Sequence, residues 1–365
     1  MKLQLTQENL NKALTNVARV AISSRNPLPI LNNILLKTVD NRLTVSATNL
    51  EIAITEHVGA KVSVEGSVTV PARLFQEYVA SLPAGNIDLS VKDNKVNIST
   101  GSYKSTINGM AADEFPVVPN LERTGGWTIS TKDLKRGLSQ VIFAAANDET
   151  RPLLTGVYLH THEGYLYAVA TDSYRLAEKR LIALKKDISL VVPSTALQDL
   201  MRIIGDGGES EVKVYEDGQQ VLFAVGESEL ISRLVDGNYP DYRKLIPSKF
   251  SITASFDRAE LTNVTKVASL FARESAGSII VGFNEAEKKV SISSVASQLG
   301  ENSSTIDTKV TGSGEISLNS RYLIDALGAF RGDTTTFSCN GKVEACILKS
   351  DDEEDYLHVI MPLKS

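Results

Sequence analysis

One pattern occurs three times along this 365-residue chain, and the repetition limits the possible folds more than any other feature. A stretch with apolar residues at helical spacing begins at Leu10, again at Leu134 and again at Leu261, which gives a period of about 124 residues. Because the same signals return in the same order, the chain is expected to contain three similar domains.

A second helical stretch follows the first one in each repeat. It begins after a short apolar run that ends at Pro71, Pro193 or Asn319; proline suits the first turn of a helix, and asparagine suits its cap. The sequence therefore predicts six helices, over residues 7–21, 72–82, 131–145, 194–204, 257–273 and 320–331.

Turn-forming dipeptides keep the same period and separate short β-branched runs, which is typical of antiparallel hairpins. They are Asp40-Asn41, Asp93-Asn94, Glu163-Gly164, Asp217-Gly218 and Asn340-Gly341. Each repeat thus reads helix, strands, helix, strands, so we predict an α+β fold of three repeated domains; the alternative is three unrelated α+β domains. We place the domains at residues 1–122, 127–248 and 251–365.

The predicted helices differ in charge from the rest of the chain. The whole chain carries a net charge of −6, yet none of the six helical spans is net negative. Cationic side chains lie opposite the apolar stripes, for example Lys12 in the first repeat, Arg136 in the second and Lys266 in the third. Lysines and arginines on helix faces bind phosphates without reading bases, so this pattern favours contact with a nucleic-acid backbone over a merely solvated face.

No catalytic constellation can be assembled from the sequence. A phosphate-binding loop ending in Gly-Lys-Ser/Thr is absent. His160 and His162 alternate on one predicted strand without a third metal ligand, and we expect them to face solvent. The acidic run 351–355 lacks the spacing of a calcium loop, so we expect a solvated loop between edge strands. Neither enzyme activity nor a cofactor or metal is expected.

The two cysteines flank the predicted turn at Asn340-Gly341. A two-residue turn would set Cys339 opposite Lys342 and place Cys346 four residues further along, too far away for a disulfide. The low cysteine count, the lack of an apolar run of about 20 residues and the lack of a signal-peptide pattern predict a cytoplasmic protein without a membrane partner.

Four motifs resemble those of the bacterial DNA sliding clamps, and the resemblance covers essentially the whole chain. They are LPILNNILL at 28–36, ATDSYRLA at 170–177, VDGNYPDY at 235–242 and VIMPL at 359–363. The resemblance implies a homodimeric ring, joined head to tail, with helices lining a hole and sheets outside. It also implies a DNA polymerase processivity factor that encircles and slides along double-stranded DNA. The implied partners are the replicative DNA polymerase, a clamp-loader ATPase, and repair and translesion polymerases that dock through short peptide motifs.

The resemblance and the charge pattern together nominate site residues. Arg25 and Arg73 match DNA-contacting positions of the family, and charge placement adds Lys12, Lys132, Arg136, Arg202, Arg258, Lys266 and Arg321. The hydrophobic peptide pocket of the family maps to Arg151, Leu153, Leu154, Thr171, Tyr174, Arg175, Leu176, Pro240, Leu245, Val343, Val359, Met361 and Leu363. For ring closure we expect Leu74 and Tyr78 to meet Leu270 and Phe271 of a second chain.

The chain departs from the family pattern at two places beside this pocket. Ser173-Tyr174 stands where many relatives carry Gly-His, and Pro152-Leu153 stands where relatives commonly show aromatic residues. The alternative function is a β-rich scaffold that binds peptides through the same pocket without encircling DNA. A hydrolase, the third class, has no acid/base pair in this sequence.

Overall fold

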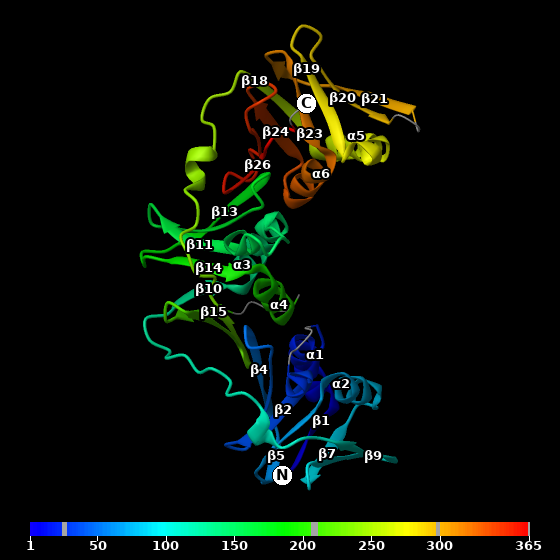
Figure 1. The fold of residues 1–365 in the computed structure, drawn as a ribbon, viewed down its shortest axis with the longest axis vertical. Helices are drawn as coiled ribbons and strands as arrows, with labels where there is room; N and C mark the ends of the chain where they lie inside the picture. The colour runs from blue at the N-terminus through cyan, green and yellow to red at the C-terminus, as the bar shows by residue number, and fades with distance from the viewer. Residues whose placement is uncertain (24–27, 206–210, 297–299, 364–365) are drawn as a thin grey trace. The chain divides into compact units, whose positions relative to one another are not determined.

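The computed structural model describes residues 1–23, 28–205, 211–296 and 300–363. All six predicted helices are present in this part of the chain (Figure 1). They are α1 (Gln7–Ser23), α2 (Ala72–Ser81), α3 (Thr131–Val141), α4 (Ser194–Ile204), α5 (Arg258–Phe271) and α6 (Ser320–Ala329). None of the helices in the described ranges is long and apolar enough to cross a membrane.

The strands form four sheets, and the chain divides into two compact units. The first unit comprises Met1–Lys132 and Thr195–Leu234, and the second comprises Asp133–Ser194 and Val235–Ser365. The central repeat thus contributes to both units, because each of its two halves extends a sheet begun by a neighbouring repeat. The predicted α+β class with antiparallel sheets is confirmed.

In the first unit, an eight-stranded sheet joins strands of two repeats. Its order is β10-β15-β16-β17-β4-β3-β2-β6, and Leu230 on β17 pairs with Ile54 on β4. Helix α1 packs against β3 and β4 with Leu10 and Leu14 fully buried. The strand bounds in this unit are β1 (Lys2–Thr6), β2 (Asn33–Val39), β3 (Arg42–Thr48), β4 (Ile52–Gly59), β5 (Lys61–Val64), β6 (Ser67–Pro71), β7 (Asn86–Lys92), β8 (Lys95–Thr100), β9 (Tyr103–Asn108), β10 (Trp127–Ser130), β15 (Glu211–Glu216), β16 (Gln220–Val225) and β17 (Ser228–Arg233).

In the second unit, a nine-stranded sheet again joins two repeats. Its order is β14-β11-β12-β13-β26-β25-β24-β18-β22, and Leu176 on β13 pairs with Val359 on β26. Helices α5 and α6 pack together beside the four-stranded sheet of this unit, whose order is β21-β20-β19-β23 (Figure 1). The strand bounds are β11 (Gly156–His162), β12 (Tyr165–Thr171), β13 (Arg175–Ala183), β14 (Ser189–Pro193), β18 (Ile252–Asp257), β19 (Ser278–Asn284), β20 (Lys289–Ala296), β21 (Gly300–Asp307), β22 (Val310–Thr311), β23 (Gly314–Asn319), β24 (Thr334–Cys339), β25 (Cys346–Lys349) and β26 (Tyr356–Ile360).

The turn at Asn340-Gly341 differs from its prediction. Strands β24 and β25 are separated by residues 340–345 rather than by two residues, and Ser338 pairs with Ile347. The same register carries Cys339 toward Cys346, so the expected pairing with Lys342 was wrong. Both thiols are free and buried, and burial raises their pKa values.

Two polar side chains predicted to face solvent, Glu353 and His160, are instead buried, whereas Asp351, Asp352 and Glu354 of the acidic run are exposed as predicted. Strands β25 and β26 lie inside the nine-stranded sheet, not at its edge, and Glu353 in the acidic run between them is 3% exposed. His160 is also buried, because its strand β11 lies between β14 and β12 and its Nε2 lies 2.8 Å from the Tyr242 hydroxyl. His162, two residues further along, stays partly exposed, as predicted.

Candidate peptide site and cationic helices

The residues nominated for the peptide site lie in the second unit. The turn between β12 and β13 begins the candidate peptide site: the Asp172 carboxylate accepts hydrogen bonds from the backbone N–H groups of Tyr174 and Arg175, each at 2.9 Å. Ser173, between Asp172 and Tyr174, adopts a left-handed backbone conformation with φ of 79°. This local geometry turns the Tyr174 side chain outward, and that side chain is 57% exposed.

The C-terminal segment lies against this turn. The backbone N–H of Met361 donates to the carbonyl oxygen of Tyr174, and that of Leu363 donates to the carbonyl oxygen of Ser317, both at 2.8 Å. These two bonds hold residues 361–363 between the start of β13 and strand β23. Met361 therefore lies beside Tyr174 with its side chain exposed.

Several of the apolar residues nominated for this site are exposed. Tyr174, Leu245, Val343 and Met361, which we call the apolar rim, are 57%, 64%, 83% and 41% exposed. The other nominated apolar residues Leu154, Leu176 and Val359 are buried, and Leu176 and Val359 belong to one core cluster with Tyr242 and Ala345. The sequence thus nominated both an exposed rim and parts of its buried support.

Arg175, nominated as a pocket wall, is committed to structural bonds. Its guanidinium donates to Asp172 at 3.0 Å, to Asp325 on α6 at 2.7 Å and to the carbonyl oxygen of Phe143 at 2.6 Å, and it stacks over the Tyr322 ring. All three acceptors come from different segments, so Arg175 ties the central repeat to the third repeat. The partners Asp325 and Tyr322 were missed, because only the tertiary fold brings α6 to this arginine.

A polar cavity of about 400 Å³ adjoins the rim. Arg151, Tyr174 and Arg321 line it together with Asn319 and Tyr322. Arg151 donates to the Ser173 hydroxyl at 2.8 Å, so the unusual Ser173 fixes one wall of this cavity. The remaining nominated residues also lie near: the Thr171 hydroxyl donates to the Arg175 carbonyl oxygen, Leu153 lies against the backbone of Gly237, and Pro240 is exposed on the same connector as Leu245.

The nominated cationic residues sit on the predicted helices or at their starts. Arg73, Lys132, Arg202, Lys266, Arg321 and Lys12 are exposed, and Arg258 is half-buried with its Nε donating to the Gly332 carbonyl oxygen. Arg136 is different, because its guanidinium lies 2.5 Å from the buried carboxylate of Glu353. Arg25 lies outside the described residues.

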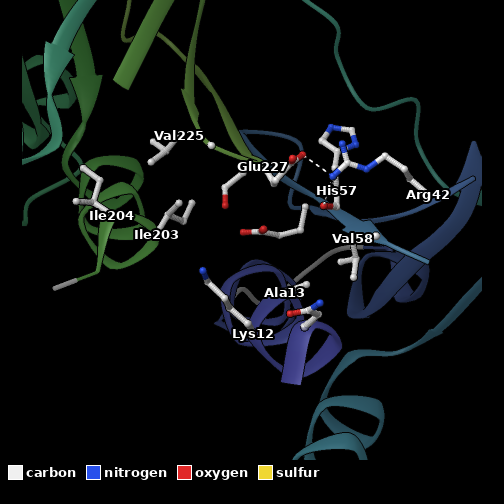
Figure 2. A pocket seen from close by; sticks show the side chains of 14 residues that line it. Lys12, Ala13, Arg42, His57, Val58, Ile203, Ile204, Val225 and Glu227 are labelled. Atoms are coloured by element: carbon white, nitrogen blue, oxygen red, sulfur yellow. Dashed lines mark hydrogen bonds and ion pairs between the residues drawn. The ribbon is translucent and has the colours of Figure 1, made fainter. Parts of the chain in front are cut away.

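A second polar pocket, of about 440 Å³, lies in the first unit beside Lys12, where β4 pairs with β17. Figure 2 shows Lys12 and Ala13 from α1 on one side of the pocket, Ile203 and Ile204 from α4 on another, and Glu227 with its carboxylate turned toward Arg42. Glu227 pairs with Arg42 at 2.6 Å. The Glu56 carboxylate, which also lines the pocket, accepts a hydrogen bond from Asn16 at 2.7 Å, and burial raises its pKa. Sequence reasoning missed this pocket, which depends on strand pairing between repeats.

The three repeats, the sheets that run from one repeat to the next and the cationic helices define the processivity-clamp class of proteins. Family models match nearly the whole chain: the DNA polymerase III beta subunit N-terminal domain matches residues 1–119, the central domain 128–241 and the C-terminal domain 243–364. The chain therefore belongs to the DNA polymerase III beta subunits, the bacterial sliding clamps. It is an accessory protein of DNA replication that serves polymerase processivity.

Individual relatives agree over nearly the full length. A beta sliding clamp from Staphylococcus aureus is 32% identical over 358 residues, covering 94% of either chain. The sliding clamp structure from Bacillus subtilis superposes with a TM-score of 0.95 at 28% identity, covering 100% of this chain and 99% of that one. A Pseudomonas aeruginosa sliding clamp bound to griselimycin has a TM-score of 0.93 at 26% identity, with 100% of both chains covered.

Proposed function

We propose that two copies of this chain close head to tail into a ring that encircles duplex DNA. The ring slides along the duplex and tethers the replicative polymerase, a clamp-loader ATPase, and repair and translesion polymerases through the candidate peptide site. The apolar rim carries the tethering half of this proposal, since four large apolar side chains exposed over a buried support fit a peptide-binding surface. We propose the cytoplasm as its location and residues 1–122, 127–248 and 251–365 as its domains.

The DNA-facing residues proposed are those nominated from the sequence. Arg73 at the start of α2 and Lys266 on α5 are exposed and available to phosphates. Arg136 also serves in this proposal, but its pair with Glu353 fixes its position and reduces the charge it offers. We expect Arg73→Glu and Lys266→Glu to shorten the residence time on DNA more than Arg136→Glu does.

Free sheet edges support the ring closure. Strand β9 is one of the two edges of the five-stranded sheet β5-β1-β7-β8-β9, and β21 is one of the two edges of the four-stranded sheet β21-β20-β19-β23. Edge strands offer unpaired backbone groups to a second chain. Leu74 on α2 and Leu270 on α5 are 54% and 52% exposed, and α5 packs against β21. With Tyr78 and Phe271 beside them, these side chains would cover the joint between two such edges.

The proposed dimer is tested by measuring the size of the protein in gel filtration. We expect Phe271→Asp to convert the eluting dimer to monomer in gel filtration, because it places a charge in an apolar joint. The matched control is Val117→Asp, a residue 93% exposed and outside the proposed joint, which should leave the dimer intact. A Phe271→Asp protein that still elutes as the dimer would remove this residue from the joint.

Encirclement of DNA is tested by comparing how long the protein stays on circular and on linear DNA. Labelled protein, loaded by a clamp-loader ATPase onto nicked circular DNA, should remain bound at moderate salt and leave once a restriction enzyme linearises the circle. Loss from circles as fast as from linear fragments favours the non-encircling scaffold instead. The peptide site is tested separately with griselimycin, whose binding Met361→Asp should abolish while the dimer in gel filtration stays unchanged.

A further inference from the structure

The connector between the second and third repeats supplies two of the proposed walls of the peptide site, Pro240 and Leu245. Residues 235–251 contain only one short helical segment, η5 (Tyr242–Leu245). Tyr242 is the only buried residue of this connector, at 3% exposed. Its backbone N–H donates to the Pro240 carbonyl oxygen at 2.7 Å, so the one buried residue lies between the two walls.

The Tyr242 hydroxyl lies between two residues of the nine-stranded sheet, Glu178 and His160. It donates a short hydrogen bond to the Glu178 carboxylate on β13. Because its hydrogen is used there, the contact of 2.8 Å to His160 Nε2 on β11 requires the imidazole to donate. The chain of bonds therefore runs from His160 through Tyr242 to Glu178 across strands β11 and β13.

Neighbouring side chains also contact the three residues His160, Tyr242 and Glu178. Arg243, the next connector residue, lies 3.2 Å from the Glu178 carboxylate and places its guanidinium 4.7 Å above the Tyr167 ring. The His160 ring stacks on Tyr158 at 4.6 Å. Burial, with the charge of Arg243, lowers the pKa of His160 to about 4, which keeps the imidazole neutral and able to serve as the single donor.

We propose that Tyr242 is a positioning residue for partner binding: its hydroxyl, fixed between His160 and Glu178, sets how the connector seats on the sheet and thereby where Leu245 stands in the apolar rim. The inference rests on the proposed peptide site. Its physical basis is that a buried hydroxyl with one donor and one acceptor partner defines a depth and an orientation, whereas an apolar ring alone permits sliding. Tyr242 itself is buried and is not part of the apolar rim.

The test removes the hydroxyl and keeps the ring. We expect Tyr242→Phe to weaken griselimycin binding about fivefold or more by calorimetry, because the connector reseats once Glu178 and His160 lose their common partner. The matched control is Tyr158→Phe, which removes a hydroxyl that contacts Ser189 at 3.2 Å and keeps the ring that stacks on Tyr239 of the connector. This variant should bind griselimycin as wild type does. Both proteins are compared below their melting temperatures.

A double-mutant cycle separates positioning from general destabilisation. If Tyr242 acts through Leu245, then Tyr242→Phe combined with Leu245→Ala binds griselimycin no more weakly than Leu245→Ala alone. Additive losses overturn the inference, as does wild-type binding by Tyr242→Phe when Leu245→Ala binds weakly. If Tyr242→Phe fails to fold, Glu178→Gln, which keeps an acceptor but loses the charge facing Arg243, replaces it in the same cycle.

A ligand-free measurement distinguishes this inference from the proposed function. In methyl NMR spectra of the intact protein, the Leu245 resonances should shift in Tyr242→Phe and stay in place in Tyr158→Phe. Unchanged Leu245 resonances overturn the positioning role whatever griselimycin does. Conversely, if Met361→Asp leaves griselimycin binding intact, the proposed peptide site fails, while shifted resonances still show that Tyr242 positions the connector.

Discussion

Glu353 offers the sharpest test of the forces that join the central and third repeats. Its side chain is 1% exposed and faces Arg136 at 2.5 Å, Gln140 at 2.9 Å and Lys179 at 3.2 Å. The backbone N–H of Arg331 adds a fourth bond at 3.2 Å. Burial alone would raise the pKa of this carboxyl, but the bonds from Arg136, Gln140 and Arg331 lower it to about 2.

The perturbation is Glu353→Gln, which keeps the shape and removes the charge. Breaking a buried ion pair costs about 3–5 kcal/mol, because the partner charge stays buried without compensation. Lys179, whose side chain is 3% exposed, keeps Asp355 at 2.6 Å, so we expect the low end, about 3 kcal/mol. For a unit of this size, such a loss lowers the melting temperature by about 6–12 °C.

The assay is thermal unfolding by calorimetry at pH 7, with Glu354→Gln as the matched control. Glu354 is adjacent and exposed, so the control should change the unfolding free energy by no more than about 0.5 kcal/mol. Because the folded-state pKa of Glu353 is lowered, its contribution is complete above about pH 4.5 and is lost as the pH falls toward 2. Equal melting temperatures for the two variants, or the same acid sensitivity in Glu353→Gln as in wild type, would refute the reasoning.

Two further predictions concern stability. Leu50 is a bulky residue with φ of 76° and is 46% exposed, so Leu50→Gly should raise the unfolding free energy by about 1 kcal/mol in urea titrations. The control is Leu28→Gly, at φ of −110° and similar exposure, which should lower the unfolding free energy. A lower unfolding free energy in both variants would contradict the strain argument. His160 and His358 are buried, and burial lowers their pKa values to about 4 and about 3. Since the unfolded chain takes up these protons near pH 6.5, the unfolding free energy should fall as the pH drops from 6.5 toward 4, and His358→Asn should flatten this slope whereas the exposed His162→Asn should not.

The helices were predictable because their signals are local. Apolar spacing around Leu10 or Leu138, together with the residues at the helix starts, depends only on neighbours within a few positions. All six helices appear where these signals fall. The dipeptide turns at Asp40-Asn41 and Asp93-Asn94 also form as predicted, with positive φ at all four residues.

Two of the errors share one physical cause, which is the distance along the chain between interacting groups. Glu353 was placed in solvent because its partners Arg136 and Lys179 lie 217 and 174 residues away. His160 was placed in solvent because its partner Tyr242 lies 82 residues away. The pairing of Cys339 was wrong because the loop length, and hence the register, is set by how residues 340–345 pack rather than by the dipeptide at their start.

The candidate site divides in the same way. The sequence, through its resemblance to the sliding clamps, named the residues of the apolar rim, and the structure places Tyr174 and Met361 side by side through a backbone bond. The sequence could not show which of these residues are exposed and which are buried beneath them. It also could not show that the Arg175 guanidinium is hydrogen-bonded to Asp172 and Asp325.

The sequence by itself thus determined the threefold repeat, the helices, the fold class and the family, because all of these follow from periodic local patterns and motifs. Only the tertiary structure decided which polar groups are buried and paired, how strands of one repeat join those of the next, and that the Tyr242 hydroxyl lies between His160 and Glu178. Burial and pairing are properties of segments far apart in the chain, and their free energies arise only when folding removes both partners from water.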